Sequence, residues 1–233
     1  MYCLGGVSIQ GSYHDINQDS FQYKEFPFGY VLVLSDGVGS CKNSQYGSKA
    51  LCNAVICLAE KYECNIKELS ENTEEFLNEL HNHWLEGLGD KKIQDCYCTA
   101  LFVIIKGNRY ISFHLGDGLL SVLSDDSCIV SLEEKLDYVN ITEAMSEVMD
   151  IDKWQIETHE VDVFQGVILA SDGLELAKYE KTMYENFSRE LFGYYKDKNK
   201  AEIEENINEW LADWPSCDDK TIAFMFLSDV GEA

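Results

Sequence analysis

Four aspartates far apart in this chain stand at the ends of predicted strands or in the turns beside them. Apolar runs such as residues 30–34 and 167–170 are typical of strands buried on both faces. A carboxylate at the tip of such a strand lies at the rim of its sheet, where several tips can converge. The four are Asp19, Asp36, Asp117 and Asp172, and the pair Asp218-Asp219 opens the last predicted strand.

Carboxylates that converge repel one another, which raises their pKa values unless a cation neutralises them. The simplest interpretation is a binuclear site for hard divalent metals, built from oxygen ligands. Taken singly, the dipeptides Asp36-Gly37 and Asp172-Gly173 are also common turn formers. The metal interpretation therefore depends on the whole set of aspartates and not on any one of them.

The composition narrows the classes of partner. The chain has 233 residues, with 18 basic and 42 acidic side chains and a formal net charge of −24. Nucleic acids and anionic membrane surfaces both select basic patches, so neither is an expected partner. No apolar run approaches the roughly 20 residues of a membrane span. The nine cysteines form no Cys-x-x-Cys motif and no zinc-type cluster, which favours a reducing, cytoplasmic location.

The periodicity predicts an α+β fold in one domain spanning residues 1–233. Apolar residues at helical spacing predict two pairs of helices, and the strands cluster between them. We therefore expect two antiparallel β-sheets packed as a sandwich and flanked by pairs of α-helices. The predicted helices lie near residues 50–62, 76–88, 183–191 and 203–211, and the clearest strands at 30–34, 99–105, 110–115, 119–123, 154–160, 167–170 and 221–227.

A series of motifs, in one order from Gly11 to Leu227, resembles those of the metal-dependent protein phosphatases of type 2C. Each motif alone is weak, but the ordered set covers nearly the whole chain. The motifs are GSYHDINQDS at residues 11–20, SDGVGS at 35–40, CTA at 98–100, HLGDG at 114–118, SDGL at 171–174 and DDKT at 218–221.

The resemblance implies a fold, an activity and a set of ligands. The family fold is a β-sandwich with helix pairs outside, and its members hydrolyse phosphoserine and phosphothreonine in proteins with Mg²⁺ or Mn²⁺. Asp36 corresponds to the aspartate that bridges both core metals, and Asp117 to the ligand of a third, more labile metal. The remaining ligands implied are Asp19, the Gly37 carbonyl, Asp172, and Asp218 rather than Asp219.

Departures from the family pattern are equally informative. His14 stands where the family usually has a phosphate-binding arginine, and Gln18 replaces a glutamate. The pattern resembles a bacterial branch with Gly-x-x-His, Gln-Asp and Asp-Gly-x-Gly-Ser signatures, whose members are often associated with a protein kinase. We hypothesise that His14 contacts the phosphate or protonates the leaving alkoxide. His14 and Asp36 are thus the predicted catalytic residues.

The chemistry expected is direct attack by a water that bridges two divalent metals. The chain has neither a Cys-x5-Arg phosphatase loop nor a Gly-x-Ser-x-Gly elbow, so no covalent intermediate is expected. The expected partners are a phosphoprotein substrate and a cognate serine/threonine kinase. Two alternatives stay open: a weak or inactive relative that binds phosphoproteins, and a phosphohydrolase of small metabolites.

Overall fold

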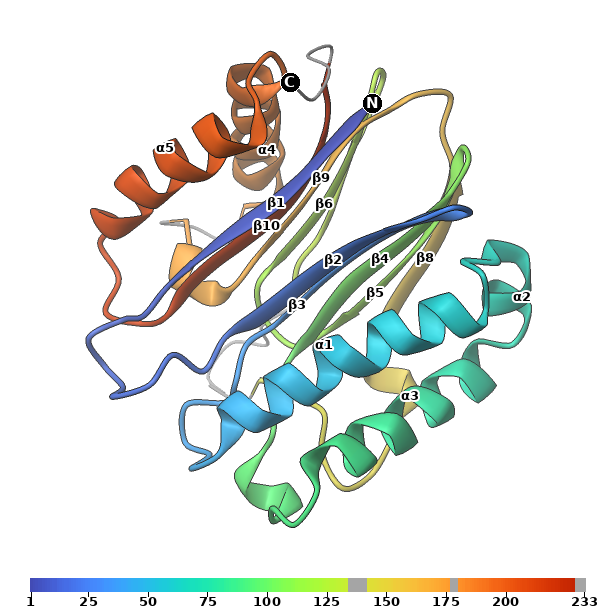
Figure 1. The fold of residues 1–233 in the computed structure, drawn as a ribbon, viewed down its shortest axis with the longest axis vertical. Helices are drawn as coiled ribbons and strands as arrows, with labels where there is room; N and C mark the ends of the chain where they lie inside the picture. The colour runs from blue at the N-terminus through green and yellow to red at the C-terminus, as the bar shows by residue number, and fades with distance from the viewer. Residues whose placement is uncertain (134–141, 177–179, 229–233) are drawn as a thin grey trace.

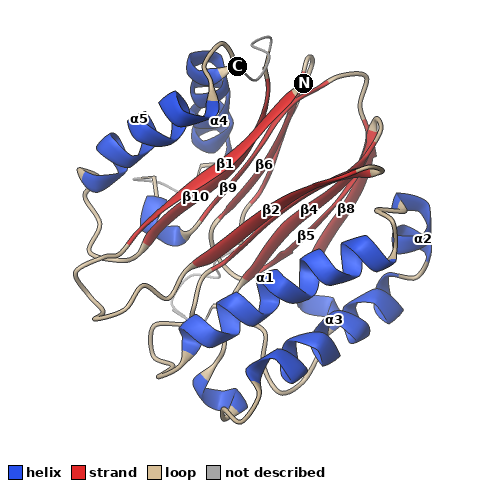
Figure 2. Ribbon diagram, viewed as in Figure 1, coloured by secondary structure: helices blue, strands red, loops and turns tan. Residues whose placement is uncertain are grey.

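Two five-stranded antiparallel sheets face each other in the computed structural model, and helices cover both outer faces (Figures 1 and 2). The structure describes residues 1–133, 142–176 and 180–228. The predicted α+β sandwich is therefore confirmed. Among the described residues, every helix is too short or too polar to cross a membrane.

The two sheets take strands from both halves of the chain. The first sheet has the order β1 (Tyr2–Ile9), β10 (Lys220–Leu227), β9 (Phe164–Ala170), β6 (Leu119–Ser124) and β7 (Cys128–Ser131). The second sheet has the order β2 (Ser20–Phe26), β3 (Gly29–Ser35), β4 (Ala100–Lys106), β5 (Arg109–Leu115) and β8 (Gln155–Glu160). The strands β1 and β2 are therefore edge strands, and Figure 1 shows them on the same side of the sandwich.

The helices lie where their apolar faces are needed. Helices α1 (Ser44–Lys61), α2 (Ile66–Glu71) and α3 (Thr73–Leu88) cover the second sheet, and α4 (Lys181–Tyr195) and α5 (Lys200–Ala212) cover the first (Figure 1). The four amphipathic helices are those that the periodicity predicts. The spacing does not predict α2, because six residues are too few to display a helical period.

Alternation along β3 explains why a continuous apolar run forms an antiparallel strand. Val31 and Val33 point into the core shared with α1 and α3, whereas Leu32 and Leu34 point between the two sheets. Successive side chains of a strand face opposite ways, so a strand with a helix layer on one face and a sheet on the other must be apolar throughout.

The strand ends that carry the aspartates lie together at one end of the sandwich. Pairing of Ser20 with Ser35, of Ala100 with Leu115, and of Ala170 with Leu119 and Ile222 aligns these tips across both sheets. A tight turn after Lys106 joins β4 and β5 at the opposite end, with Gly107 at a φ of +62°.

Candidate metal centre

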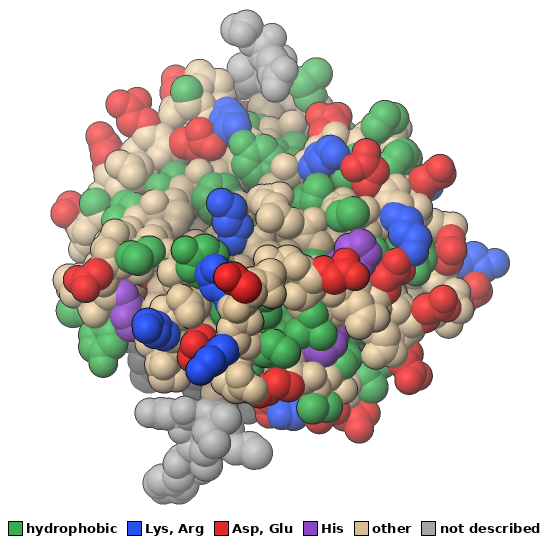
Figure 3. Space-filling model, turned by 60° about the horizontal axis from the view of Figure 1, so that its bottom comes forward, with side chains coloured by type: hydrophobic (Ala, Val, Ile, Leu, Met, Phe, Trp, Pro, Cys, Tyr) green, Lys and Arg blue, Asp and Glu red, His purple; other side chains and the backbone are tan. Residues whose placement is uncertain are grey.

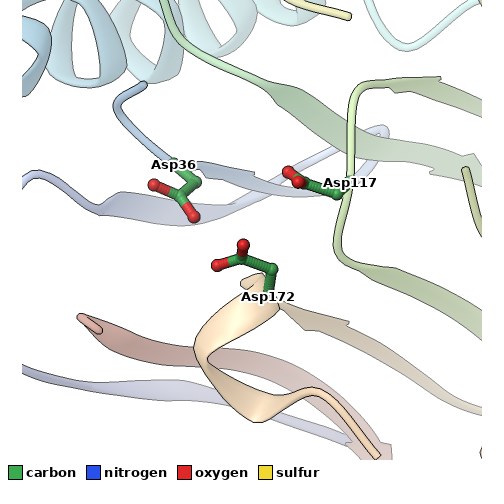
Figure 4. A group of neighbouring side chains, drawn as sticks. All are labelled: Asp36, Asp117 and Asp172. Atoms are coloured by element: carbon green, nitrogen blue, oxygen red, sulfur yellow. The ribbon is translucent and has the colours of Figure 1, made fainter. Parts of the chain in front are cut away.

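Three predicted ligands meet at the aligned strand tips. Carboxylate oxygens of Asp36, Asp117 and Asp172 all lie within 4.8 Å of one another. Asp36 follows β3, Asp117 lies in the turn between β5 and β6, and Asp172 begins the short 3-10 turn after β9, so the three converge from both sheets (Figure 4). The sequence predicts this convergence, because it places each aspartate at the end of a predicted strand.

Asp19 and Asp218 adjoin this cluster. Ser171 Oγ donates a hydrogen bond of 2.8 Å to Asp19 Oδ2, and protonated Asp36 donates a further one to Asp19. Asp218 is close enough for its negative charge to raise the pKa of Asp172. The structure thus gathers all five predicted metal-binding aspartates at one end of the molecule.

Burial and mutual repulsion hold protons on the cluster. Burial raises the pKa of Asp19 to about 6 and, together with the charge of Asp117, the pKa of Asp172 to about 7. Burial also raises the pKa of Asp36 well above its usual range, and the charges of Asp19, Asp172 and Asp117 add to that effect. Without a cation, part of the cluster stays protonated near neutral pH.

The donor set fits hard divalent cations. Asp19 Oδ1 and Asp172 Oδ1 are buried and have no hydrogen-bond partner among the residues that the structure describes. A buried carboxylate oxygen is costly unless a donor or a cation satisfies it. Aspartate oxygens alone, without a cysteine or histidine in the group, match the ligand preference of Mg²⁺ and Mn²⁺.

Local packing explains why glycine follows Asp36. A Cβ on Gly37 would lie 2.8 Å from the Gln18 carbonyl oxygen and 2.8 Å from the side chain of Ser44. The Asp36 amide donates to Thr99 Oγ1 at 2.9 Å, and Ser35 Oγ donates to the Thr99 carbonyl at 2.6 Å. The CTA motif therefore fixes the loop that carries Asp36. The Gly37 carbonyl stays a predicted ligand.

Asp219 has a role that the sequence did not reveal. It is 3% exposed, its Oδ1 accepts from the Gly11 amide at 2.8 Å, and its Oδ2 accepts from the Gln18 amide at 2.6 Å. Both oxygens are thus engaged by the backbone of the segment 11–18 that leads to Asp19. This arrangement favours Asp218 as the metal ligand of the pair. Asp219 instead acts as a clamp, by which we mean that its two hydrogen bonds hold the segment 11–18 in place.

Asp219→Asn is expected to destabilise the protein by about 2 kcal/mol, because an amide NH₂ cannot accept the hydrogen bond that a buried N–H donates. Urea unfolding measured with a chelator present tests this without metal effects. Asp213→Asn, at an exposed aspartate after α5, is the matched control. An unfolding free energy equal to that of wild type would show that Asp219 is no clamp.

The ring of His14 is half-exposed beside the segment that follows Asp36. A Cβ on Gly39 would lie 3.0 Å from His14 Nε2, and the Tyr13 ring meets the His14 ring edge-on at 4.9 Å. In the described part of the chain the ring makes no hydrogen bond, so its nitrogens stay available. The predicted contact of His14 with phosphate stays a prediction.

One further side chain supports Asp117, and a histidine lies buried in the strand before it. Thr142 Oγ1 donates to Asp117 Oδ2 at 2.8 Å, a contact across 25 residues that no motif indicates. His114, in β5, is buried, and its Nδ1 lies 2.7 Å from Ser131 Oγ. Burial lowers the pKa of His114 to about 4, so this ring is neutral at pH 7 and has a structural role.

Comparison with known proteins identifies a family and several similar folds. A family model described as "Protein phosphatase 2C" matches residues 12–214. No curated protein gives a significant sequence match. Among solved structures, a bacterial serine phosphatase matches with a TM-score of 0.71 and 16% identity, covering 98% of this chain and 99% of that one.

Two other solved structures share the fold at similarly low identity. Serine/threonine phosphatase Stp1 from Staphylococcus aureus has a TM-score of 0.70 and 14% identity, covering 97% of this chain and 95% of that one. The catalytic domain of the phosphatase PstP, in complex with two manganese ions, has a TM-score of 0.66 and 17% identity, covering 98% and 99%. The family model extends over most of the chain, and this chain therefore belongs to the protein phosphatase 2C family.

Proposed function

We propose that this protein is a Mg²⁺- or Mn²⁺-dependent phosphatase that removes phosphate from phosphoserine and phosphothreonine in proteins. The observation that carries the proposal is the convergence of carboxylates around Asp36. A protein that only binds phosphoproteins has no need to keep repelling charges together at a cost in stability. The membership of the protein phosphatase 2C family supports the same reaction.

Each aspartate has a proposed role. Asp36, central to the cluster, would hold the core cations together with Asp19, Asp172, Asp218 and the Gly37 carbonyl. Asp117, which accepts a hydrogen bond from Thr142, would hold a third cation. When bound, such cations neutralise the phosphoryl oxygens and lower the pKa of a water toward neutrality. Thr99 and Ser171 keep Asp36 and Asp19 oriented, so the protein supplies a preorganised site.

Hydrolysis assays separate this function from its two alternatives. We expect turnover of p-nitrophenyl phosphate with Mn²⁺ and none with excess chelator. A phosphothreonine peptide is expected to be a better substrate than nucleotides or sugar phosphates. Metal-dependent turnover confined to small metabolites would favour the metabolite phosphohydrolase, and phosphopeptide binding without turnover would favour the inactive relative.

His14→Ala is expected to lower kcat/KM by about 100-fold, the usual contribution of a positioned acid or base, and to remove one limb of the pH profile. A histidine bonded to the phosphate would also make KM depend on pH, which a fixed arginine charge would not. His83→Ala, on α3, is the matched control. An unchanged rate and pH profile would exclude both roles for His14.

We further infer one domain over residues 1–233, a cytoplasmic location, and a phosphoprotein partner with its serine/threonine kinase. All nine cysteines are free thiols, which fits a reducing compartment. Figure 3 shows the face at the bottom of Figure 1, where acidic, basic and hydrophobic side chains are interspersed. No large basic patch is visible on that face, which fits a protein partner better than a nucleic acid.

A further inference from the structure

A cavity of about 350 Å³ lies between the two sheet edges, away from the metal centre. Residues 2–4 of β1, residues 23–25 of β2 and residues 198–200 at the start of α5 line this edge cavity. The candidate metal centre adjoins the far end of β1. The distance from Leu4 to Ile9 is five residue steps, which is roughly 17 Å at the rise of a strand. The volume of the edge cavity is at the lower end of the range for small-molecule sites.

Three lysines gather at the edge cavity in a chain that has few basic residues. Lys24 Nζ lies 3.1 Å from Glu60 and Lys200 Nζ lies 3.8 Å from Glu204, and these side chains are one-third to three-fifths exposed. Exposed pairs of this kind hold their partners weakly. Lys198 has no carboxylate within 4 Å in the described part of the chain, and its ammonium lies 4.5 Å from the centre of the Tyr194 ring. These cations can turn to an anion in the cavity.

The backbone of β1 adds polar groups to the same cavity. The Met1 carbonyl accepts from the Ser228 amide across the sheet, whereas the Gly6 amide points to the free edge and donates to Glu204. Main-chain groups of successive strand residues point to alternate sides. The N–H and C=O of Leu4 therefore face the free edge, at the wall of the cavity.

The remaining lining combines aromatic and apolar side chains with the polar Asn199 and Ser228 and with Glu25, whose Oε1 accepts a hydrogen bond of 3.3 Å from the Tyr30 hydroxyl. Tyr2, Leu4 and Tyr23 line the cavity, and the Lys200 ammonium lies 4.8 Å from the centre of the Tyr23 ring. The cations of the lining are lysines, and a lysine ammonium binds a phosphate as a compact point charge. A ligand that satisfies both parts of the lining has a phosphate and an apolar body.

We propose that the edge cavity binds a small organic phosphate at a site separate from the metal centre. Lys198 and Lys200 contact the phosphate, and the Tyr2 and Tyr23 rings contact the apolar body. This inference does not depend on the phosphatase reaction, because binding at the edge cavity involves none of the clustered aspartates.

Calorimetric titration of metal-free protein, kept in EDTA, tests the proposal with adenosine monophosphate and inorganic phosphate as probes. We expect saturable 1:1 binding of adenosine monophosphate, tighter than that of phosphate. Lys198→Gln combined with Lys200→Gln is expected to weaken it at least 10-fold, and Lys67→Gln, at an exposed lysine on α2, to leave it unchanged. Absence of saturable binding, or equal weakening by Lys67→Gln, would overturn the proposal.

Lysine acylation followed by mass spectrometry gives a second readout on the wild-type chain. Adenosine monophosphate is expected to protect Lys198 and Lys200 from acylation and to leave Lys67 reactive. This measurement remains decisive if the double variant does not fold. Unprotected Lys198 and Lys200 at saturating probe would overturn the assignment. Binding of an acidic peptide but neither phosphate probe would assign the edge to peptide pairing instead and contradict our proposal.

Discussion

Asp36→Asn is expected to abolish most activity while making the metal-free protein more stable. Asp36 is a proposed ligand of the core cations, and an asparagine in its place would lack the negative charge that would neutralise them. Loss of that charge stabilisation costs several kcal/mol in the transition state, which corresponds to a fall in kcat/KM of about 1000-fold or more. Steady-state assays with saturating Mn²⁺ measure this effect.

The stability part of this prediction follows from the surroundings of Asp36. Burial and the charges of Asp19, Asp172 and Asp117 oppose its ionisation. An asparagine removes that repulsion, and its NH₂ can donate to Asp19 as the protonated carboxyl does. In EDTA at pH 8 we expect a higher free energy of unfolding than that of wild type.

Asp90→Asn, at a fully exposed carboxyl, is the control for a general change in net charge. It is expected to leave both activity and stability unchanged. A stable Asp36→Asn protein with wild-type activity would remove Asp36 from the proposed mechanism. A variant less stable than wild type in EDTA would show that repulsion within the cluster is not the dominant local energy.

The main helices and strands, and the convergence of the aspartates, could be predicted from the sequence. A strand that is buried on both faces can be recognised in the sequence as a continuous apolar run, as in β3. Apolar residues at helical spacing predict α1, α3, α4 and α5. The four-residue β7 and the six-residue α2 were not predicted, because each is shorter than the window in which a period can be recognised. Their formation is decided by packing against β6 and α3.

The supporting residues of the site could not be predicted in the same way. Asp218 and Asp219 are adjacent residues of the same type. Only the fold shows that both carboxylate oxygens of Asp219 accept hydrogen bonds from the segment 11–18. Thr142 likewise has no motif around it and reaches Asp117 from a distant segment. The proposed metal ligands could be predicted from residue type at the ends of strands, whereas the groups that orient them depend on tertiary contacts.

The protection that Mn²⁺ gives against unfolding is expected to grow steeply as the pH rises from about 5 to 8. The carboxyls of Asp19 and Asp172 have pKa values of about 6 and about 7 in the folded chain, above the usual value near 4 in an unfolded one. The folded state therefore binds more protons than the unfolded state between these limits. The stability that these carboxyls contribute is fully present below about pH 4 and is lost as the pH rises through about 7.

A cation reverses this loss, because it needs the oxygens deprotonated and neutralises the repulsion that opposes deprotonation. With excess Mn²⁺ the melting temperature should therefore fall less with pH than in EDTA, so that the difference between the two curves is small at pH 5 and largest near pH 8. Calorimetric titration at pH 6.5 should show protons released to the buffer on Mn²⁺ binding. Asp172→Asn should flatten the EDTA curve, since it removes one titrating carboxyl. A shift in melting temperature that is the same at pH 5 and pH 8 would mean that these aspartates do not bind the metal.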